Sequence, residues 1–111
     1  MTFNEYQENS YRAIQHHESH KDEVLNWMVG LSEETGEVAN LIKHRYWGGE
    51  ELDREKLIKE MGDVLWYLSA MASALEIDLN HVAKTNMHKL EKRHPGGTFS
   101  IANSINRKRE K

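Results

Sequence analysis

The sequence predicts an all-α fold: a four-helix bundle-like domain followed by a short C-terminal tail. Apolar residues up to Pro95 recur with the spacing of amphipathic helices, and no segment shows the strict alternation of a strand. Pro95 is also the only proline among 111 residues, so little interrupts the helical pattern before it. We therefore expect one helical domain over residues 1–95 and a weakly patterned tail over residues 96–111.

The first two helices have recognisable beginnings. Thr2 and Glu5 have the spacing of a capping box, which predicts a helix that runs to about His16. After a short connector, Asp22 is the expected N-cap of a second helix. That helix is long and should end at the paired glycines of residues 48–49, because glycine favours a helix terminus.

The third and fourth helices are predicted in the same way. Asp53 can cap a third helix that continues to Leu75, and the broad apolar face of this helix implies burial on more than one side. Asp78 can cap a fourth helix that stops near His94, because Pro95 and two glycines follow. These four segments account for nearly the whole chain before the tail.

Composition narrows the classes of function. The chain has no cysteine, no long apolar run and no charged-then-apolar leader, which argues against disulfides, thiol chemistry, a membrane span and secretion. We expect a cytoplasmic protein. The formal net charge is −3, and basic residues are dispersed except for a C-terminal run, interpreted as a solvated tail, of Arg107, Lys108, Arg109 and Lys111. A nucleic-acid polymer is therefore not an expected partner.

The most informative feature is a set of five carboxylates on the second and third predicted helices. They are Glu33, Glu34, Glu37, Glu60 and Asp63. On each helix two of them are three residues apart, so each pair shares one side of its helix. Glu34 lies as far before the turn at residues 48–49 as Asp63 lies after it, and Glu37 mirrors Glu60 in the same way. An antiparallel hairpin would place the two pairs level with each other.

Carboxylates that face each other repel, so this arrangement requires compensation. Magnesium or manganese suits an all-oxygen set of ligands, whereas zinc more often takes histidine or cysteine. Gly36 and Gly62 lie beside the acids, although a glycine inside a helix costs about 1 kcal/mol relative to alanine. Close approach of another backbone would explain both. The alternative is a solvated acidic stripe, which a single E-x-x-E would favour, whereas two mirrored pairs favour a metal site.

Two sequence motifs carry a family resemblance. The segment 33–38 reads E-E-T-G-E-V, and the segment 60–65 reads E-M-G-D-V-L. In this order on two helices, they resemble the paired E-E-x-x-E and E-x-x-D motifs of the MazG-like nucleoside triphosphate pyrophosphohydrolases. The similarity extends over residues 31–47, 57–75 and 86–95, which together make up most of the helical part of the chain.

The resemblance implies an all-α NTP pyrophosphatase fold and a homo-oligomer, either a dimer or a tetramer. It also implies magnesium-dependent hydrolysis of an NTP or dNTP to the monophosphate and pyrophosphate, a housecleaning activity on the nucleotide pool. We expect manganese, which suits the same oxygen ligands, as a substitute ion. By matching position, the implied metal ligands are Glu34, Glu37, Glu60 and Asp63. Glu33 would be the base that orients or deprotonates the attacking water.

Further residues are candidates for contact with the nucleotide. The resemblance suggests that Asn86 and Lys89, on one face of the fourth helix, reach the sugar or phosphates, with Arg93 one turn further. Ordinary helix surface is the alternative for all three. Tyr67 lies one turn beyond the E-x-x-D motif, where its ring can either stack on a base or pack in the core. Trp47 is a further stacking candidate, although an aromatic residue at a helix end more often covers the core.

Two alternatives come from other classes of protein. One is a non-catalytic helical interaction module that keeps the acids as a cation-stabilised surface, and partner binding without turnover would mark it. The other is a di-iron carboxylate bundle, which is disfavoured because such bundles use Glu-x-x-His spacing, whereas the third residue here is Glu37 or Asp63. The histidines His16, His17 and His20 are a weaker metal candidate, because no carboxylate partner is fixed beside them in the sequence.

Overall fold

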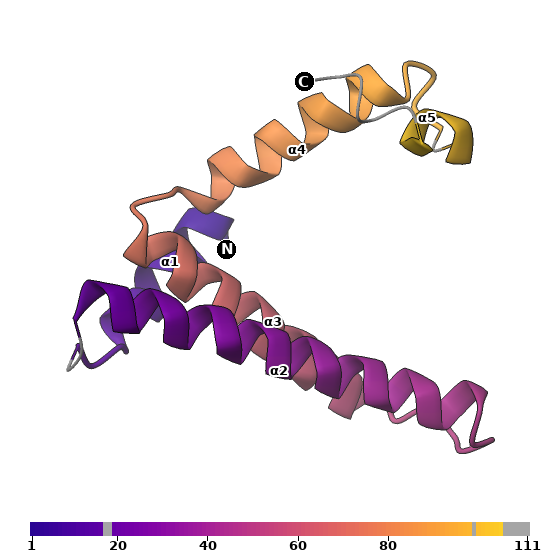
Figure 1. Ribbon diagram of the computed structural model, residues 1–111, viewed down its shortest axis with the longest axis horizontal. Helices are drawn as coiled ribbons and strands as arrows, with labels where there is room; N and C mark the ends of the chain where they lie inside the picture. Colours follow the sequence, from indigo (N-terminus) through magenta and orange to yellow (C-terminus); the bar gives the residue numbers. More distant parts are fainter. Residues whose placement is uncertain (17–18, 99, 106–111) are drawn as a thin grey trace. The chain divides into compact units, whose positions relative to one another are not determined.

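The computed structural model describes residues 1–16, 19–98 and 100–105. The described chain contains helices and no strand, which confirms the all-α class (Figure 1). Its helices are α1 (Phe3–Arg12), α2 (His20–Tyr46), α3 (Arg54–Ala74), α4 (Leu79–Arg93) and α5 (Ile101–Ile105). They belong to two compact units, Met1–Asp78 with α1, α2 and α3, and Leu79–Lys111 with α4 and α5. None of the described helices combines the length and the apolar character that a membrane crossing requires.

The first helix begins with the predicted capping box. The Glu5 amide donates to the Thr2 hydroxyl at 3.1 Å, and the Thr2 amide donates to the Glu5 carboxylate at 3.2 Å. The helix ends at Arg12 rather than near His16, so the predicted end is wrong. The chain leaves the helix early, and His16 Nδ1 instead lies 2.6 Å from the carboxylate of Glu23 on α2.

The second helix has 27 residues and starts earlier than predicted. Its N-cap is Ser19, whose hydroxyl accepts from the Asp22 amide at 3.3 Å, so the prediction of Asp22 as the cap is wrong. Asp22 instead lies in the first turn, where a carboxylate is favourable beside the positive end of the helix dipole. The predicted end is confirmed, because α2 stops at Tyr46 and Gly49 follows with a φ of 71°.

The third helix begins at its predicted cap, where the Asp53 carboxylate accepts from the Lys56 amide at 3.1 Å. After the helix, the chain reverses through Glu76, which has a φ of 56°. This left-handed conformation lets the Ile77 amide donate to the Ala72 carbonyl at 2.8 Å, which forms the long hydrogen bond of a Schellman turn. The end of α3 therefore has a defined geometry although no glycine occupies the reversal.

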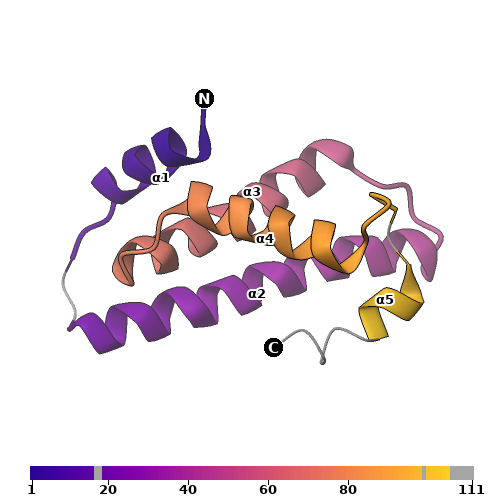
Figure 2. The ribbon, with the colours of Figure 1, turned by 90° about the horizontal axis from the view of Figure 1, so that it is seen from above.

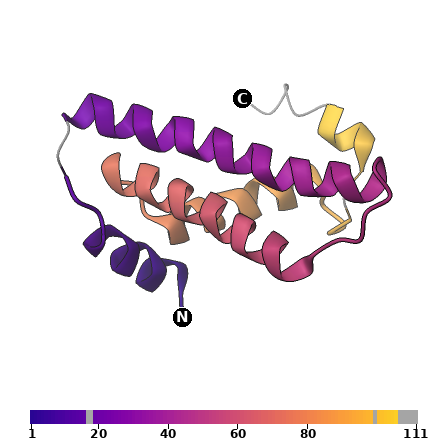
Figure 3. The same cartoon turned by 90° about the horizontal axis from the view of Figure 1, so that it is seen from below.

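Side chains of α1 hold this reversal, and α1 lies along the C-terminal half of α3 (Figure 2). The Gln7 amide donates to the Ile77 carbonyl at 2.7 Å and to the Ser73 hydroxyl at 3.2 Å. The Asn4 amide donates to the Asp78 carboxylate at 3.2 Å. With α2 on another side, α3 is covered on two sides, as its broad apolar face predicted (Figure 3).

The helices α2 and α3 run antiparallel and side by side, with the turn around residues 47–53 at one end (Figures 1 and 3). Half-buried apolar side chains line their seam: Trp27, Leu31, Val38 and Leu41 from α2, and Leu57, Val64, Leu68 and Met71 from α3. The helical apolar pattern also includes large residues that are exposed in this chain: Leu25, Met28, Ile42, Ile58, Met61 and Leu75. They stay exposed because a seam between two helices buries one stripe of each helix.

The second unit contains α4, a turn and α5. The helix α4 ends at Arg93, which confirms the predicted stop near His94. The Gly97 amide donates to the His94 carbonyl at 2.8 Å, and the Ser100 amide donates to Nδ1 of the buried His94 ring at 3.2 Å. These bonds order the turn before α5, and the weakly patterned tail thus contains a short helix. The basic run at the C-terminus lies outside the described residues.

Candidate metal centre

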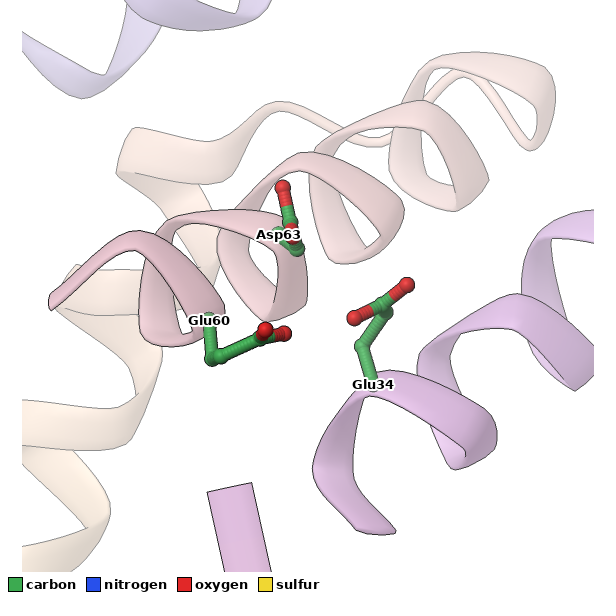
Figure 4. A group of neighbouring side chains, drawn as sticks. All are labelled: Glu34, Glu60 and Asp63. Carbon is green, nitrogen blue, oxygen red and sulfur yellow. The ribbon is translucent and has the colours of Figure 1, made fainter. Parts of the chain in front are cut away.

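Three carboxylates meet across the seam between α2 and α3. Glu34 comes from α2, and Glu60 and Asp63 come from α3 (Figure 4). One oxygen from each lies within 4.8 Å of the others. Glu34 and Glu60 are half-buried and Asp63 is exposed, so the group opens to solvent on one side. In the part of the chain that the structure describes, this is the one group of three or more acidic or histidine side chains with metal-ligand spacing.

The donor set fits a hard divalent cation. All three donors are carboxylate oxygens, which Mg²⁺ and Mn²⁺ favour over nitrogen or sulfur. Oxygens around an octahedral Mg²⁺ lie about 3 Å apart when adjacent and about 4 Å apart when opposite, given bonds of about 2.1 Å. Small side-chain rotations would bring the three oxygens from their present separations into that range. The exposed side of the group leaves room for water or phosphate oxygens.

The electrostatics of the group also favour a cation. The pKa of Glu34 is raised, first by the partial loss of solvent around this half-buried residue. The negative charges of Asp63, Glu60 and Glu37, together with a hydrogen bond to the Glu60 side chain, raise this pKa further. A carboxylate that is partly buried among like charges holds a proton more readily than usual. A divalent cation at this point would remove the same penalty.

The other two predicted acids lie outside this group. Glu37 is exposed, and its charge contributes to the raised pKa of Glu34, but its oxygens are not among the three that converge. Glu33 is also exposed and projects about 100° around the helix from Glu34. The predicted roles of Glu37 as a ligand and Glu33 as a base therefore stay predictions.

The two aromatic candidates lie in different surroundings. Tyr67 is half-buried and packs against two tryptophan rings, with ring centroids 6.1 Å from Trp27 and 5.2 Å from Trp66. Trp47 is 83% exposed, so it does not cover the core. It lies 13 residues after Glu34, about 20 Å along the helix, so it is remote from the carboxylate group of its own chain.

The three candidates for contact with sugar or phosphates all lie on α4, as predicted. Asn86 and Lys89 are exposed and three residues apart, and Arg93 is the last residue of the helix. A separation of three or four residues places them on one side of α4. Their proposed contacts with a nucleotide stay predictions.

Gly36 and Gly62 were expected to allow another backbone to approach closely. A Cβ atom added at either glycine would meet nothing within 4 Å in the described chain. Both residues are exposed, because they lie away from the seam on their helices. The expected close approach is therefore wrong for the described part of the unit Met1–Asp78.

Gly30, which no sequence motif singled out, is buried where α2 faces Tyr67. A signal was present, because Gly30 and Tyr67 are equally far from the turn at residues 48–49, just as Glu34 and Asp63 are. The Trp27 and Trp66 rings, 5.4 Å apart and nearly perpendicular, complete this aromatic cluster. Residues that are equally far from the turn thus form a packing contact as well as the carboxylate group.

The histidine cluster does not form a metal group among the described residues. His16 has a carboxylate partner after all, because its Nδ1 lies 2.6 Å from Glu23 and its ring packs 5.1 Å from that of Tyr11. The expectation that no carboxylate is fixed beside these histidines is therefore wrong for His16. His17 lies outside the described residues.

The fold and the site define a class: an all-α protein in which carboxylates of two antiparallel helices converge at a candidate site for divalent metal. This chain belongs to the family described as the MazG nucleotide pyrophosphohydrolase domain, which matches residues 22–98. The matched segment includes α3, α4, nearly all of α2 and the three converging carboxylates. The resemblance that the two motifs indicated is confirmed.

Two relatives have clear sequence similarity. The Gene 37 protein of Mycobacterium phage L5 is 34% identical over 75 residues, which cover 64% of this chain and 66% of that protein. The uncharacterized protein YpjD of Bacillus subtilis (strain 168) is 38% identical over 74 residues, which cover 62% of this chain and 65% of that protein. This chain thus spans just under two thirds of the length of each relative. No solved structure matches it.

Proposed function

We propose that this protein is a metal-dependent nucleoside triphosphate pyrophosphohydrolase that cleaves an NTP or dNTP to the monophosphate and pyrophosphate, as housecleaning of the nucleotide pool. The observation that carries the proposal is the convergence of Glu34, Glu60 and Asp63 inside the segment that matches the family. Mg²⁺, or Mn²⁺ in its place, would neutralise phosphate charge and make a nearby water more acidic.

The proposed roles of the acids rest on the geometry of the group and on the motifs that the chain shares with the family. Glu34, Glu60 and Asp63 would hold the cation, and Glu37 would add a ligand after a change of side-chain rotamer. Glu33 is proposed to accept the proton of the attacking water. The water oxygen bonds to the α-phosphorus. The bond between that phosphorus and the oxygen that bridges to the β-phosphate breaks, and pyrophosphate leaves. One water is consumed for each nucleotide, and no covalent enzyme intermediate is required.

The remaining parts of the proposal concern binding and assembly. Asn86, Lys89 and Arg93 are proposed to bind the sugar or phosphates, since α4 presents amide and cationic groups along one side. A homo-oligomer is proposed because large apolar side chains such as Ile58, at 64% exposure, stay exposed in the single chain. A cytoplasmic location, where nucleotide pools are found, fits the cysteine-free sequence.

The test is pyrophosphate release from a panel of ordinary and modified NTPs and dNTPs, with Mg²⁺, with Mn²⁺ and with chelator. Metal-dependent release of equal amounts of pyrophosphate and monophosphate is expected. Glu60→Gln should abolish it, while Glu51→Gln, at an exposed position in the turn between α2 and α3, should retain it. Circular dichroism of both variants would show that the helices are intact.

The alternative of a non-catalytic interaction module makes the opposite prediction. In that case the folded protein releases no pyrophosphate from any nucleotide in the panel, with either metal. Such a result would overturn the proposed activity. The exposed apolar side chains of α2 and α3 would then be the surface to examine for a protein partner.

A further inference from the structure

Gly30 leaves a gap on α2 that the ring of Tyr67 fills. A Cβ atom at residue 30 would overlap three atoms of that ring, the farthest of which, Cζ, would lie 2.7 Å away. Alanine therefore cannot replace Gly30 unless the ring or one of the helices moves. Of the glycines in the matched helices, Gly36 and Gly62 differ in this respect, because a Cβ atom there would meet nothing within 4 Å.

The Tyr67 ring has little freedom to move aside. Trp66 meets it edge-on, with ring planes at 87° and centroids 5.2 Å apart. Trp27, from the opposite helix, lies 6.1 Å from it and also contacts Trp66 at 5.4 Å. Close-packed aromatic side chains have few alternative rotamers. A Cβ atom at residue 30 that pushes on this ring would therefore displace the helices.

This contact lies next to the carboxylate group. Gly30 is four residues before Glu34 on α2, and Tyr67 is four residues after Asp63 on α3. Four residues of helix correspond to about 6 Å, so the contact lies one helical turn along the same seam. The separation between the carboxylates depends on how α2 is placed against α3, because Glu34 belongs to one helix and its two partners to the other.

We propose that Gly30 is a positioning residue for the metal centre: by admitting the Tyr67 ring, it sets the spacing of α2 and α3 at which the three carboxylates can bind one cation. This inference rests on the proposed function, because it assumes that the group binds a divalent metal. Metal sites tolerate ligand errors of only a few tenths of an ångström, so a displacement of the helices at Gly30 weakens binding.

The test is Mn²⁺ binding by the full chain without nucleotide, measured from the electron paramagnetic resonance of free Mn²⁺. Gly30→Ala is expected to weaken the affinity about tenfold or more, in the range seen when residues that support metal ligands are changed. Gly36→Ala is the matched control, because it makes the same substitution two residues from Glu34 but into open space. Its affinity for Mn²⁺ should equal that of the unchanged protein.

A second variant keeps the proposal testable if Gly30→Ala does not fold. Tyr67→Leu removes the ring that enters the gap and is expected to weaken Mn²⁺ binding. Adding Gly30→Ala to Tyr67→Leu puts a methyl group into the space that the ring vacates and should recover part of the lost affinity. Such coupling between the two positions is what a double-mutant cycle measures.

The outcomes separate this inference from the proposed function. If the unchanged protein binds no Mn²⁺, the proposed metal centre itself fails. If it binds Mn²⁺, and folded Gly30→Ala and Tyr67→Leu bind it equally well, the positioning role is overturned and the contact serves packing alone. A loss of thermal stability without a change in Mn²⁺ affinity would likewise show that the contact serves packing alone.

Discussion

Glu34 and Asp63 come from different helices, lie equally far from the turn at residues 48–49, and have carboxylate oxygens within 4.8 Å of each other. Their proximity follows from the antiparallel pairing of α2 and α3, which brings mirrored positions to the same level. The arrangement brings like charges together in a partly buried cluster, where they repel one another. Several measurable properties of the protein depend on that repulsion.

Without divalent metal, Glu34 should make the stability depend on pH. The raised pKa means that the folded chain holds this proton more tightly than the unfolded chain. Below the ordinary glutamate pKa both states are protonated. As the pH rises from that value through the raised pKa, the unfolded state loses its proton first, and the free energy of unfolding falls. Above the raised pKa the loss is complete.

Glu34→Gln isolates this effect, because glutamine resembles the protonated acid. In chelator, the variant should unfold at a higher temperature than the unchanged protein near neutral pH. The difference should vanish in acid, below the ordinary glutamate pKa. Thermal unfolding at a series of pH values measures it, and an equal difference at every pH would mean that the charge of Glu34 is not responsible.

Divalent metal should stabilise the folded chain, because only the folded chain brings the three carboxylates together. Mg²⁺ or Mn²⁺ at 100 times its dissociation constant should add about 2.7 kcal/mol to the free energy of unfolding. Denaturant unfolding with and without the metal measures this gain. Glu60→Gln should show little of it, and an equal gain in that variant would place the bound ion elsewhere.

Changing Glu37 or Glu60 to glutamine should affect Mn²⁺ affinity to different degrees, because Glu60 belongs to the converging group and Glu37 does not. Both variants should lose turnover, since both acids are proposed ligands of the catalytic complex. Without nucleotide, however, Glu60→Gln should lower Mn²⁺ affinity about 100-fold and Glu37→Gln about tenfold or less. Equal losses would mean that Glu37 binds the ion directly before the nucleotide arrives.

Alanine at Gly36 should stabilise the protein. A Cβ atom there meets nothing within 4 Å, and alanine is favoured over glycine inside a helix by about 0.5–1 kcal/mol. A gain of this size should raise the melting temperature by about 2–8 °C in a small domain. A lower melting temperature would show instead that another segment, from this chain or from a second copy, approaches α2 at Gly36.

The predictable part of this fold is what local chemistry determines. The caps at Thr2 and Asp53 follow from side chains that bond to amides three residues away, and both are present. That Glu34 lies level with Asp63 along the two helices follows from counting residues on each side of a turn. The start of α2 was misplaced because Ser19 and Asp22 are equally good caps by type, and the local sequence does not choose between them.

The unpredictable part depends on contacts distant in the sequence. Gly36 and Gly30 look alike as helix glycines, and only the position of α3 shows that one is open and the other filled by Tyr67. The exposure of Ile58 and Met61 is equally invisible in the sequence, because an apolar stripe does not reveal what covers it. In the tail, the His94 ring accepts the Ser100 amide just before α5, a bond between residues with no motif in common.

Because Asn4 and Gln7 form hydrogen bonds with the end of α3, shortening the protein from its N-terminus would affect more than the N-terminal helix itself. The family match starts at residue 22, so a fragment cut to the matched segment would lack α1 altogether. The reversal at Glu76 would then lose the side chains that bond to Ile77 and Asp78. We therefore expect the smallest stable fragment to be longer than the homologous segment.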